Sequence, residues 1–224
     1  MRKVNNIFEP KASRILRGLL VNPGIAWSIR VLAEEVDVSV GYTHAVIASL
    51  LDYGYVVRNE AERLELVNPV ELLDRWASYY QYLYENNFLD YYIMDNDIES
   101  VLDKLRKVKS GYALTALAGA FLVSPYVRPR TVELYVRDDV EKVVGVLGLM
   151  PVEKDGNVRL VTPYDTGVFY GARVVDGLNV VSDVQLYVDL KNYPARGVEA
   201  SMGLLEDIKK EWSGYLLEVS ESVR

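Results

Sequence analysis

The stretch that decides the fold is SIRVLAEEVDVSVGYTHAVIASLLDYGYVVRNEAERLELVNP, residues 28–69. A first helix contains Ala33, and Asp37-Val38 form the turn that follows it. Ser39 offers the side-chain oxygen that a second helix needs at its N-terminus. That helix carries apolar residues at helical spacing and ends at Gly54, because glycine suits the left-handed position after a last turn. The pattern predicts a helix-turn-helix.

Two short alternating runs, Tyr55–Arg58 and Arg63–Val67, flank a polar turn and predict a hairpin. A helix-turn-helix followed by such a hairpin is typical of winged-helix domains, whose second helix enters the DNA major groove. Upstream, a helix is expected from Pro10 to Val21, stopped by Asn22-Pro23-Gly24. Residues 1–69 are therefore expected to form a winged helix-turn-helix domain, of a size that folds alone.

Composition limits the class of protein. Of the 224 residues, 50% are hydrophobic, and no apolar run approaches the roughly 18 residues of a membrane span. No secretory signal is visible at the N-terminus, so we expect a cytoplasmic protein without a membrane partner. The absence of cysteine excludes disulfides and thiolate chemistry, and the single histidine, His44, excludes the common zinc sites. We expect neither a metal nor a cofactor.

The net charge of −7 is unevenly distributed. Residues 1–68 hold eight basic and eight acidic side chains, whereas residues 69–224 hold 17 basic and 24 acidic ones. An acidic C-terminal part repels DNA, while a neutral N-terminal part can still present a local basic face. Scarce glutamine and absent cysteine fit a heat-adapted source.

Residues 70–110 are rich in aromatic side chains, most densely in RWASYYQYLYENNFLDYYIM, residues 75–94. Tyrosines at helical spacing usually pack in a core, so we expect a helical connector whose rings are buried. A homodimer surface is the alternative, because aromatic residues concentrate at interfaces. The acids among the rings disfavour a base-stacking platform.

Residues 111–224 mix helical and strand patterns without regular βαβ repetition, which predicts an α+β domain. A capping box, Ser182 followed by Gln185, starts one of its helices, and Asp176-Gly177 is a strong hairpin signal. The expected helices are Ala113–Val123, Val140–Leu149, 182–190 and one after Pro194, and the expected strands are Thr131–Arg137, Asn157–Thr162, Gly167–Val175 and Leu178–Val181.

The second helix of the helix-turn-helix presents small and hydroxylic residues but no arginine or lysine, the residues that most often bind guanine edges. Basic contacts must then come from neighbouring helices and the wing. We expect double-stranded DNA to be contacted by Arg14, Arg17, Arg30, Ser39, Gly41, Tyr42, Thr43, His44, Ser49, Arg58 and Arg63. The alternative is a winged helix that binds protein, since a fold alone does not fix a function.

A second alternative is a Mg²⁺-dependent nuclease. Asp165, Asp189 and Lys191 imitate the acid and acid-x-lysine spacing of such enzymes, in which carboxylates hold the metal ion. The capping box, however, places Asp189 and Lys191 on a helix with their side chains on different sides. Asp138-Asp139 is interpreted as a helix cap instead of a metal site. We expect no catalytic residues.

Two C-terminal segments resemble a known family: YALTALAGAFLVSPYV (112–127) and VVSDVQLYVDLKNYPARGVEAS (180–201). They are similar to characteristic blocks of AbiEi-type antitoxins, the transcriptional regulators of type IV toxin–antitoxin systems, and of their archaeal relatives. The resemblance implies a repressor of its own operon with an N-terminal winged helix. It also implies a C-terminal domain that counteracts a nucleotidyltransferase-like toxin. The residues that match the pattern are Asp189, Pro194, Arg196, Gly197 and Glu199.

Overall fold

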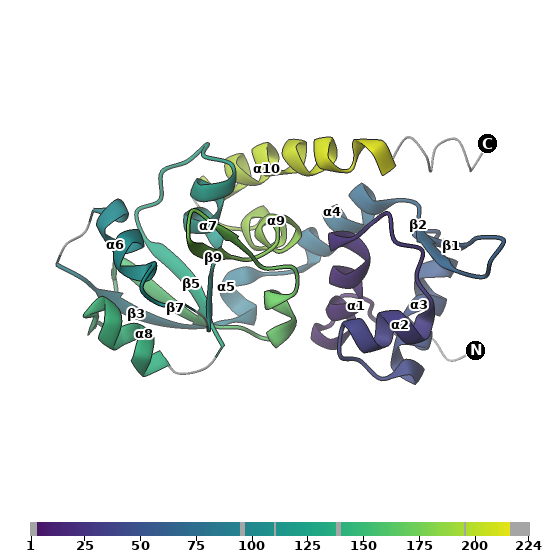
Figure 1. Cartoon of the computed structure of the whole chain (residues 1–224), viewed down its shortest axis with the longest axis horizontal. Helices are drawn as coiled ribbons and strands as arrows, with labels where there is room; N and C mark the ends of the chain where they lie inside the picture. Colours follow the sequence, from purple (N-terminus) through teal and green to yellow (C-terminus); the bar gives the residue numbers. More distant parts are fainter. Residues whose placement is uncertain (1–3, 95–96, 110, 138–139, 195, 216–224) are drawn as a thin grey trace.

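The computed structural model describes residues 4–94, 97–109, 111–137, 140–194 and 196–215. A helical part with a two-stranded hairpin comes first, and a mixed α/β part built on a larger sheet follows (Figure 1). We call the part up to β2 the head and the part from α4 onward the body. The mixture of helices and strands agrees with the expected α+β class.

The head consists of helices packed on a hairpin. The elements are α1 (Pro10–Val21), α2 (Ile29–Glu35), α3 (Val40–Asp52), β1 (Val56–Arg58) and β2 (Leu64–Leu66). β1 and β2 pair antiparallel and lie within the two runs expected to form a hairpin. Trp27, just before α2, adds an antiparallel bridge to Leu64, which ties the hairpin to the helices.

The ends of the head helices follow local chemistry with one exception. Pro10 occupies the first turn of α1, where a missing N–H does no harm. Gly54 has φ +74° just after α3, as expected for the residue that ends this helix. The expected side-chain cap by Ser39 is wrong, because Ser39 caps α3 only by its extended backbone. The hydroxyl of Thr43 instead donates to the Ser39 carbonyl at 3.1 Å.

The described strands of the body form a seven-stranded mixed sheet in the order β6-β3-β7-β5-β4-β9-β8. β4–β9 and β5–β7 are parallel pairs, and the remaining pairs are antiparallel. The strands are β3 (Asn87–Tyr92), β4 (Tyr112–Leu114), β5 (Val132–Val136), β6 (Met150–Pro151), β7 (Val158–Thr162), β8 (Arg173–Val175) and β9 (Leu178–Val180). Every residue of β5 is buried, so this central strand is covered on both faces of the sheet.

Several helices of the body pack around α9. The elements are α4 (Pro69–Tyr79), α5 (Tyr82–Glu85), α6 (Ile98–Leu105), α7 (Ala116–Val123), α8 (Val140–Leu147), the 3-10 helix η1 (Thr166–Phe169), α9 (Asp183–Lys191) and α10 (Gly197–Glu211). α9 contacts α10, α4, α7, α1 and α5, and it is buried from Val184 to Leu190. A helix surrounded in this way has no polar face to show to water. It begins as expected, with Ser182 accepting a hydrogen bond from the Gln185 amide at 3.2 Å.

Three expected elements need correction. The connector expected to be helical contains β3, which pairs with β7 over five residues, so part of the connector belongs to the sheet. The helix expected from Ala113 starts only at Ala116, because Tyr112–Leu114 pair with β5 and β9. The strand expected at Gly167–Val175 is reduced to Arg173–Val175, because Thr166–Phe169 form η1, which Asp165 caps locally by accepting from the Gly167 amide. In the first two cases pairing with distant residues decided between conformations that an apolar run cannot distinguish.

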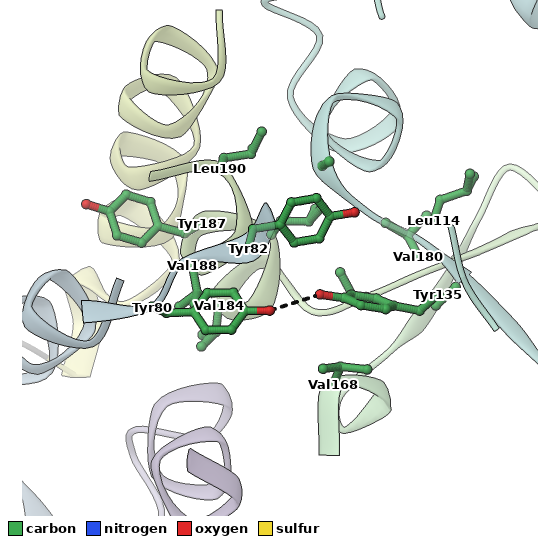
Figure 2. Close-up of a cluster of buried hydrophobic side chains, with 14 of the residues drawn as sticks. Tyr80, Tyr82, Leu114, Tyr135, Val168, Val180, Val184, Tyr187, Val188 and Leu190 are labelled. Carbon is green, nitrogen blue, oxygen red and sulfur yellow. Dashed lines mark hydrogen bonds between the residues drawn. The ribbon is translucent and has the colours of Figure 1, made fainter. Parts of the chain in front are cut away.

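One continuous cluster of buried apolar side chains runs through both head and body. The aromatic segment contributes Trp76, Tyr80 and Tyr82, each at most 3% exposed, as expected for packed rings. Figure 2 shows Tyr80 and Tyr82 beside Tyr135 of β5 and the buried side of α9. Tyr84, by contrast, is 87% exposed. The rings thus fill the space between sheet and α9 and extend toward the head.

Candidate nucleic-acid interface

The helix α3 has an inward side that builds the head core and an outward side that is only partly open. Thr43, Val46, Ile47 and Leu50 are buried on the inward side. At about 100° per residue, Gly41, Ala45 and Ala48 lie on the opposite side. Gly41 is exposed, and a side chain added there would meet no atom within 4 Å. Ala45 and Ala48, however, are only 9% and 5% exposed.

The segment Val4–Glu9, which precedes α1, lies against this helix, and we call it the strap. The Val4 carbonyl accepts a hydrogen bond from the Ser49 hydroxyl at 3.4 Å, and the Glu9 carboxylate accepts one from the Tyr42 hydroxyl. The strap therefore runs along one flank of α3 from Tyr42 to Ser49. Partial burial and the Glu9 carboxylate raise the pKa of Tyr42, so its hydroxyl stays protonated.

A groove of about 520 Å³ remains between the strap and α3. Its walls are Val4, Asn5, Asn6 and Glu9 on one side and Gly41, Tyr42 and Ala45 on the other. Among the described residues that line the groove, Glu9 has the only carboxylate and none is a lysine or arginine. A cation lies close by at Lys11, whose Nζ is 5.4 Å from the centroid of the Tyr42 ring.

The residues at and within α3 that were expected to contact DNA fall into two groups. Ser39 and Gly41 are exposed, and Tyr42 and His44 are half-buried, so their polar groups lie at the surface of α3. Thr43 and Ser49 are 0% and 2% exposed, and Ser49 donates to backbone carbonyls. Thr43 and Ser49, which were expected to contact DNA, do not reach the surface in this conformation.

Two of the expected arginines at the surface of the head are held by neighbouring acids. Arg30 pairs with Glu34 at 3.1 Å, and Arg58 pairs with Glu62 at 3.6 Å, each at i,i+4 spacing. Exposed pairs of this kind are weak, on the order of 0–1 kcal/mol, so a phosphate can displace the carboxylate. Arg63 is exposed and makes no ion pair within the described part of the chain. The hairpin therefore carries one exposed arginine that is outside any ion pair among the described residues.

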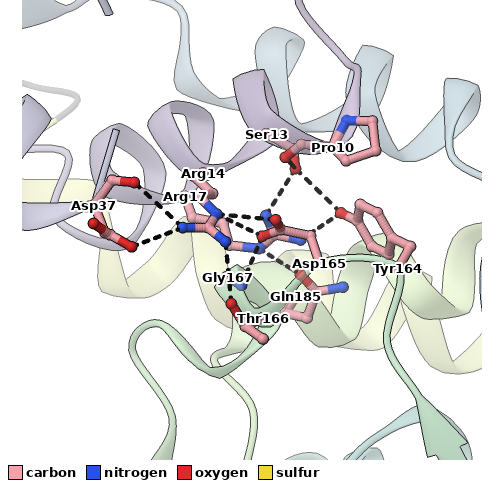
Figure 3. Close-up of polar contacts among 10 residues, drawn as sticks. All are labelled: Pro10, Ser13, Arg14, Arg17, Asp37, Tyr164, Asp165, Thr166, Gly167 and Gln185. Carbon is pink, nitrogen blue, oxygen red and sulfur yellow. Dashed lines mark hydrogen bonds and ion pairs between the residues drawn. The ribbon is translucent and has the colours of Figure 1, made fainter. Parts of the chain in front are cut away.

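Arg14 belongs to the joint between head and body (Figure 3). Its Nε donates to both carboxylate oxygens of Asp165 at 2.9 Å, and its Nη2 donates to Thr166 at 3.1 Å. Its Nη1 reaches Asp37 at 3.3 Å. The bond to Asp165 is the main cause of the raised pKa of Arg14. These bonds hold η1 against the head. The Arg14 side chain, which was expected to contact DNA, therefore makes its contacts within the protein.

Arg17 is fully buried at the same joint, and its expected place on the DNA-binding surface is wrong. Its guanidinium donates to Gln185 of α9 at 2.8 Å, to Ser13 at 2.8 Å and to Tyr164 at 2.5 Å. It also lies over the ring of Trp76, 4.9 Å from the centroid. These contacts join the head to α4 and α9 of the body. Position 17 lies outside the stripe formed by Ile15, Leu16, Leu19 and Leu20, so no periodic pattern in the sequence indicates this burial.

Behind Arg17 lies a buried carboxylate, Asp189. It accepts hydrogen bonds from Thr115 at 2.5 Å, Gln185 at 2.7 Å and Tyr135 at 3.1 Å. Complete burial raises its pKa to about 7, and the hydrogen bonds and the charge of Arg17 partly oppose that rise. Gln185 thus bridges the guanidinium and the carboxylate across the joint.

The three residues of the nuclease alternative do not form one site. Asp165 binds Arg14, Asp189 is buried in the network above, and Lys191 donates to Asp74 at 2.6 Å. Lys191 is partly exposed whereas Asp189 is not, as expected for opposite sides of a helix. Among the described residues there is no cluster of three or more His, Cys, Asp or Glu side chains able to hold a metal ion. Asp138-Asp139 lie outside the described residues.

Residues 65–208 match a known protein family, described as transcriptional regulator, AbiEi antitoxin, type IV TA system. The match extends from β2 through most of α10 and includes both segments, 112–127 and 180–201, that carried the resemblance. That resemblance is confirmed. Comparisons with curated proteins and with solved structures gave no match. None of the helices in the described ranges has the length and apolar character of a membrane span.

Proposed function

Because this chain belongs to the AbiEi antitoxin family of type IV toxin–antitoxin transcriptional regulators, we propose that it binds double-stranded DNA and represses its own operon. The family match covers the body, and the head supplies the element suited to DNA. The observation that carries the proposal is the succession of α1, α2, α3 and an antiparallel hairpin at residues 10–66. This is the order of elements in a winged helix-turn-helix, in which α3 enters the major groove and the hairpin contacts the backbone.

The proposed contacts divide between bases and phosphates. Ser39, Gly41, Tyr42 and His44 lie on or near the open part of α3, where hydroxyl and imidazole groups can bond base edges. Arg30, Arg58 and Arg63 are the proposed phosphate contacts, since phosphate bonds position the protein without reading sequence. So few cations predict a modest affinity for one head, and a homodimer on two half-sites would multiply it.

The body is the proposed antitoxin part. Its sheet and surrounding helices make up most of the region matched by the family. We infer that this part counteracts a nucleotidyltransferase-like toxin, and that the protein acts in the cytoplasm, where its operon lies. Arg196 and Glu199 pair with each other on the surface at 2.7 Å. Their match to the family pattern thus reflects the start of α10.

The test is fluorescence anisotropy with duplexes that tile the DNA upstream of the coding sequence, measured over a range of salt concentrations. Binding through phosphates must weaken as salt rises, with a slope set by the number of phosphate contacts. The double variant Arg58→Ala with Arg63→Ala should weaken binding to every duplex equally and lower the slope by about two contacts. Arg196→Ala removes an exposed arginine of the body and should leave both quantities unchanged.

A specific observation favours a second candidate, a head that binds protein. Arg30 of α2 pairs with Glu34 of the same helix, Arg58 of β1 pairs with Glu62 of the following turn, and the flank of α3 is covered by the strap. A head of this kind would show no binding to any upstream duplex even at low salt. That result would replace the first proposal with the second.

A further inference from the structure

The strap occupies the flank of the helix that the proposed function assigns to DNA. We propose that the strap, Val4–Glu9, is an autoinhibitory segment that masks α3 and must move aside before α3 can enter the major groove. The inference rests on the proposed function, because it concerns the same helix. It adds a closed state of the chain to the binding reaction.

The contacts of the strap reach two separate elements. On α3 it is held at both ends, by Ser49 at Val4 and by Tyr42 at Glu9. On α4 it is held at Tyr79, whose hydroxyl accepts from the Asn6 amide at 2.8 Å and whose ring lies 5.4 Å from that of Phe8. The Asn6 side chain also accepts from the Phe8 amide at 2.9 Å, which folds the segment into a turn. The strap thus bridges α3 and α4.

Steric size decides whether α3 can bind DNA with the strap in place. A helix with its side chains is about 10–12 Å across, and the major groove is about 12 Å wide. A chain segment packed beside the helix adds its own thickness, at least roughly 5 Å if it is taken as the spacing of neighbouring strands in a sheet. The covered helix is therefore too wide for the groove on the flank from Tyr42 to Ser49, whereas the bare helix fits.

The contacts of the strap favour the closed state but are few enough that an open state is also populated. Ile7, at 5% exposed, is the only fully buried side chain among the strap's apolar residues, Val4 and Phe8 are partly buried against the same core, and the remaining contacts are single hydrogen bonds and one ring pair. Segments with few buried contacts open locally without unfolding the rest of a protein. If the open state is a minor one, the apparent dissociation constant exceeds the intrinsic one by the inverse of its population. We expect a factor of about ten.

Two variants test the strap from opposite directions. Asn6→Ala with Phe8→Ala removes its hold on Tyr79 and leaves every residue of α3 unchanged. Val4→Cys with Ser49→Cys puts a thiol at each residue of the hydrogen bond between the Val4 carbonyl and the Ser49 hydroxyl, and because the sequence contains no other cysteine, any intramolecular disulfide must join these two residues. Each single cysteine variant is the matched control. Anisotropy with the upstream duplexes is measured for all of them, and thermal melting and mass spectrometry check folding and cross-linking.

The loosened variant should bind about tenfold more tightly than the parent, and the oxidised pair should bind at least tenfold more weakly than the same protein after reduction. Equal binding by the loosened, oxidised and parent proteins would overturn the strap while leaving the proposed function intact. Absence of binding in every form, the loosened one included, would overturn both. If the loosened variant does not fold, the comparison of oxidised and reduced protein decides alone. If the disulfide does not form, the loosened variant decides.

Discussion

Replacing Arg17 with alanine should destabilise the whole protein. The side chain is fully buried and makes three hydrogen bonds, to Gln185, Ser13 and Tyr164, in addition to its stacking on Trp76. Ser13 and Tyr164 can still bond to each other, as they already do at 3.2 Å. The Gln185 side-chain oxygen, in contrast, loses its partner inside the protein.

The expected magnitude follows from these losses. An orphaned buried acceptor costs about 1–3 kcal/mol, and breaking a buried charged network costs about 3–5 kcal/mol in total. We therefore expect Arg17→Ala to lower the free energy of unfolding by about 4 kcal/mol. Arg17→Met, which keeps much of the volume, should lower it by about 2 kcal/mol less. Arg30→Ala removes an exposed arginine on the neighbouring helix and should change it by at most about 0.5 kcal/mol.

The assay is urea unfolding followed by circular dichroism and by tryptophan fluorescence. Trp76 lies directly under the Arg17 guanidinium, so its emission should report the joint. Coincident transitions in the parent and non-coincident ones in Arg17→Ala would show that head and body unfold together only through this joint. A loss below about 1 kcal/mol, comparable to that of Arg30→Ala, would refute the role assigned to the buried guanidinium.

Three further predictions concern the body. Asp189 has a folded pKa of about 7, above its usual 3.8, so the folded protein holds a proton that the unfolded chain releases. The free energy of unfolding should therefore fall as pH rises from 4 to 7. Asp189→Asn should remove the part of this fall above pH 6. The fall that remains below pH 6 is assigned to Glu133, whose pKa burial raises to about 6. Gly156→Ala places a Cβ 2.4 Å from a backbone oxygen of β3 and should cost about 1–3 kcal/mol in urea unfolding, whereas Gly145→Ala, in open space within α8, should gain about 0.5–1 kcal/mol. Asp165→Ala removes both the cap of η1 and the partner of Arg14. It should lower the free energy of unfolding by roughly 1–2 kcal/mol and the melting temperature by a few degrees. An unchanged melting curve would contradict the role of Asp165 in holding head and body together.

The head was the part most predictable from the sequence, because its signals are local. Proline at the start of α1, glycine after α3 and the alternation of the hairpin each depend on neighbouring residues only. The start of α9 was predictable for the same reason, since the capping box of Ser182 and Gln185 is a local signal. These elements lie close to their expected positions.

What could not be predicted depends on partners far apart in the chain. β3 and β4 become strands because β7, β5 and β9 are available to pair with them. Arg17 becomes a joint residue because residue 185, 168 positions away, faces it. The strap leaves no periodic signal, since the hydrogen bonds that fix its position go to α3 and α4, and only the bond between the Asn6 side chain and the Phe8 amide lies within it.

The buried joint has a geometric consequence for a pair of such chains. With Arg17, Arg14 and a shared core holding the head to the body, a head cannot pivot independently to find its half-site. In a dimer formed through the bodies, the distance and the angle between the two α3 helices would therefore be fixed. Such a dimer would bind only operators with one spacing between their half-sites. Inserting half a helical turn, about five base pairs, between the half-sites would move the second half-site to the far side of the duplex and abolish binding by both heads.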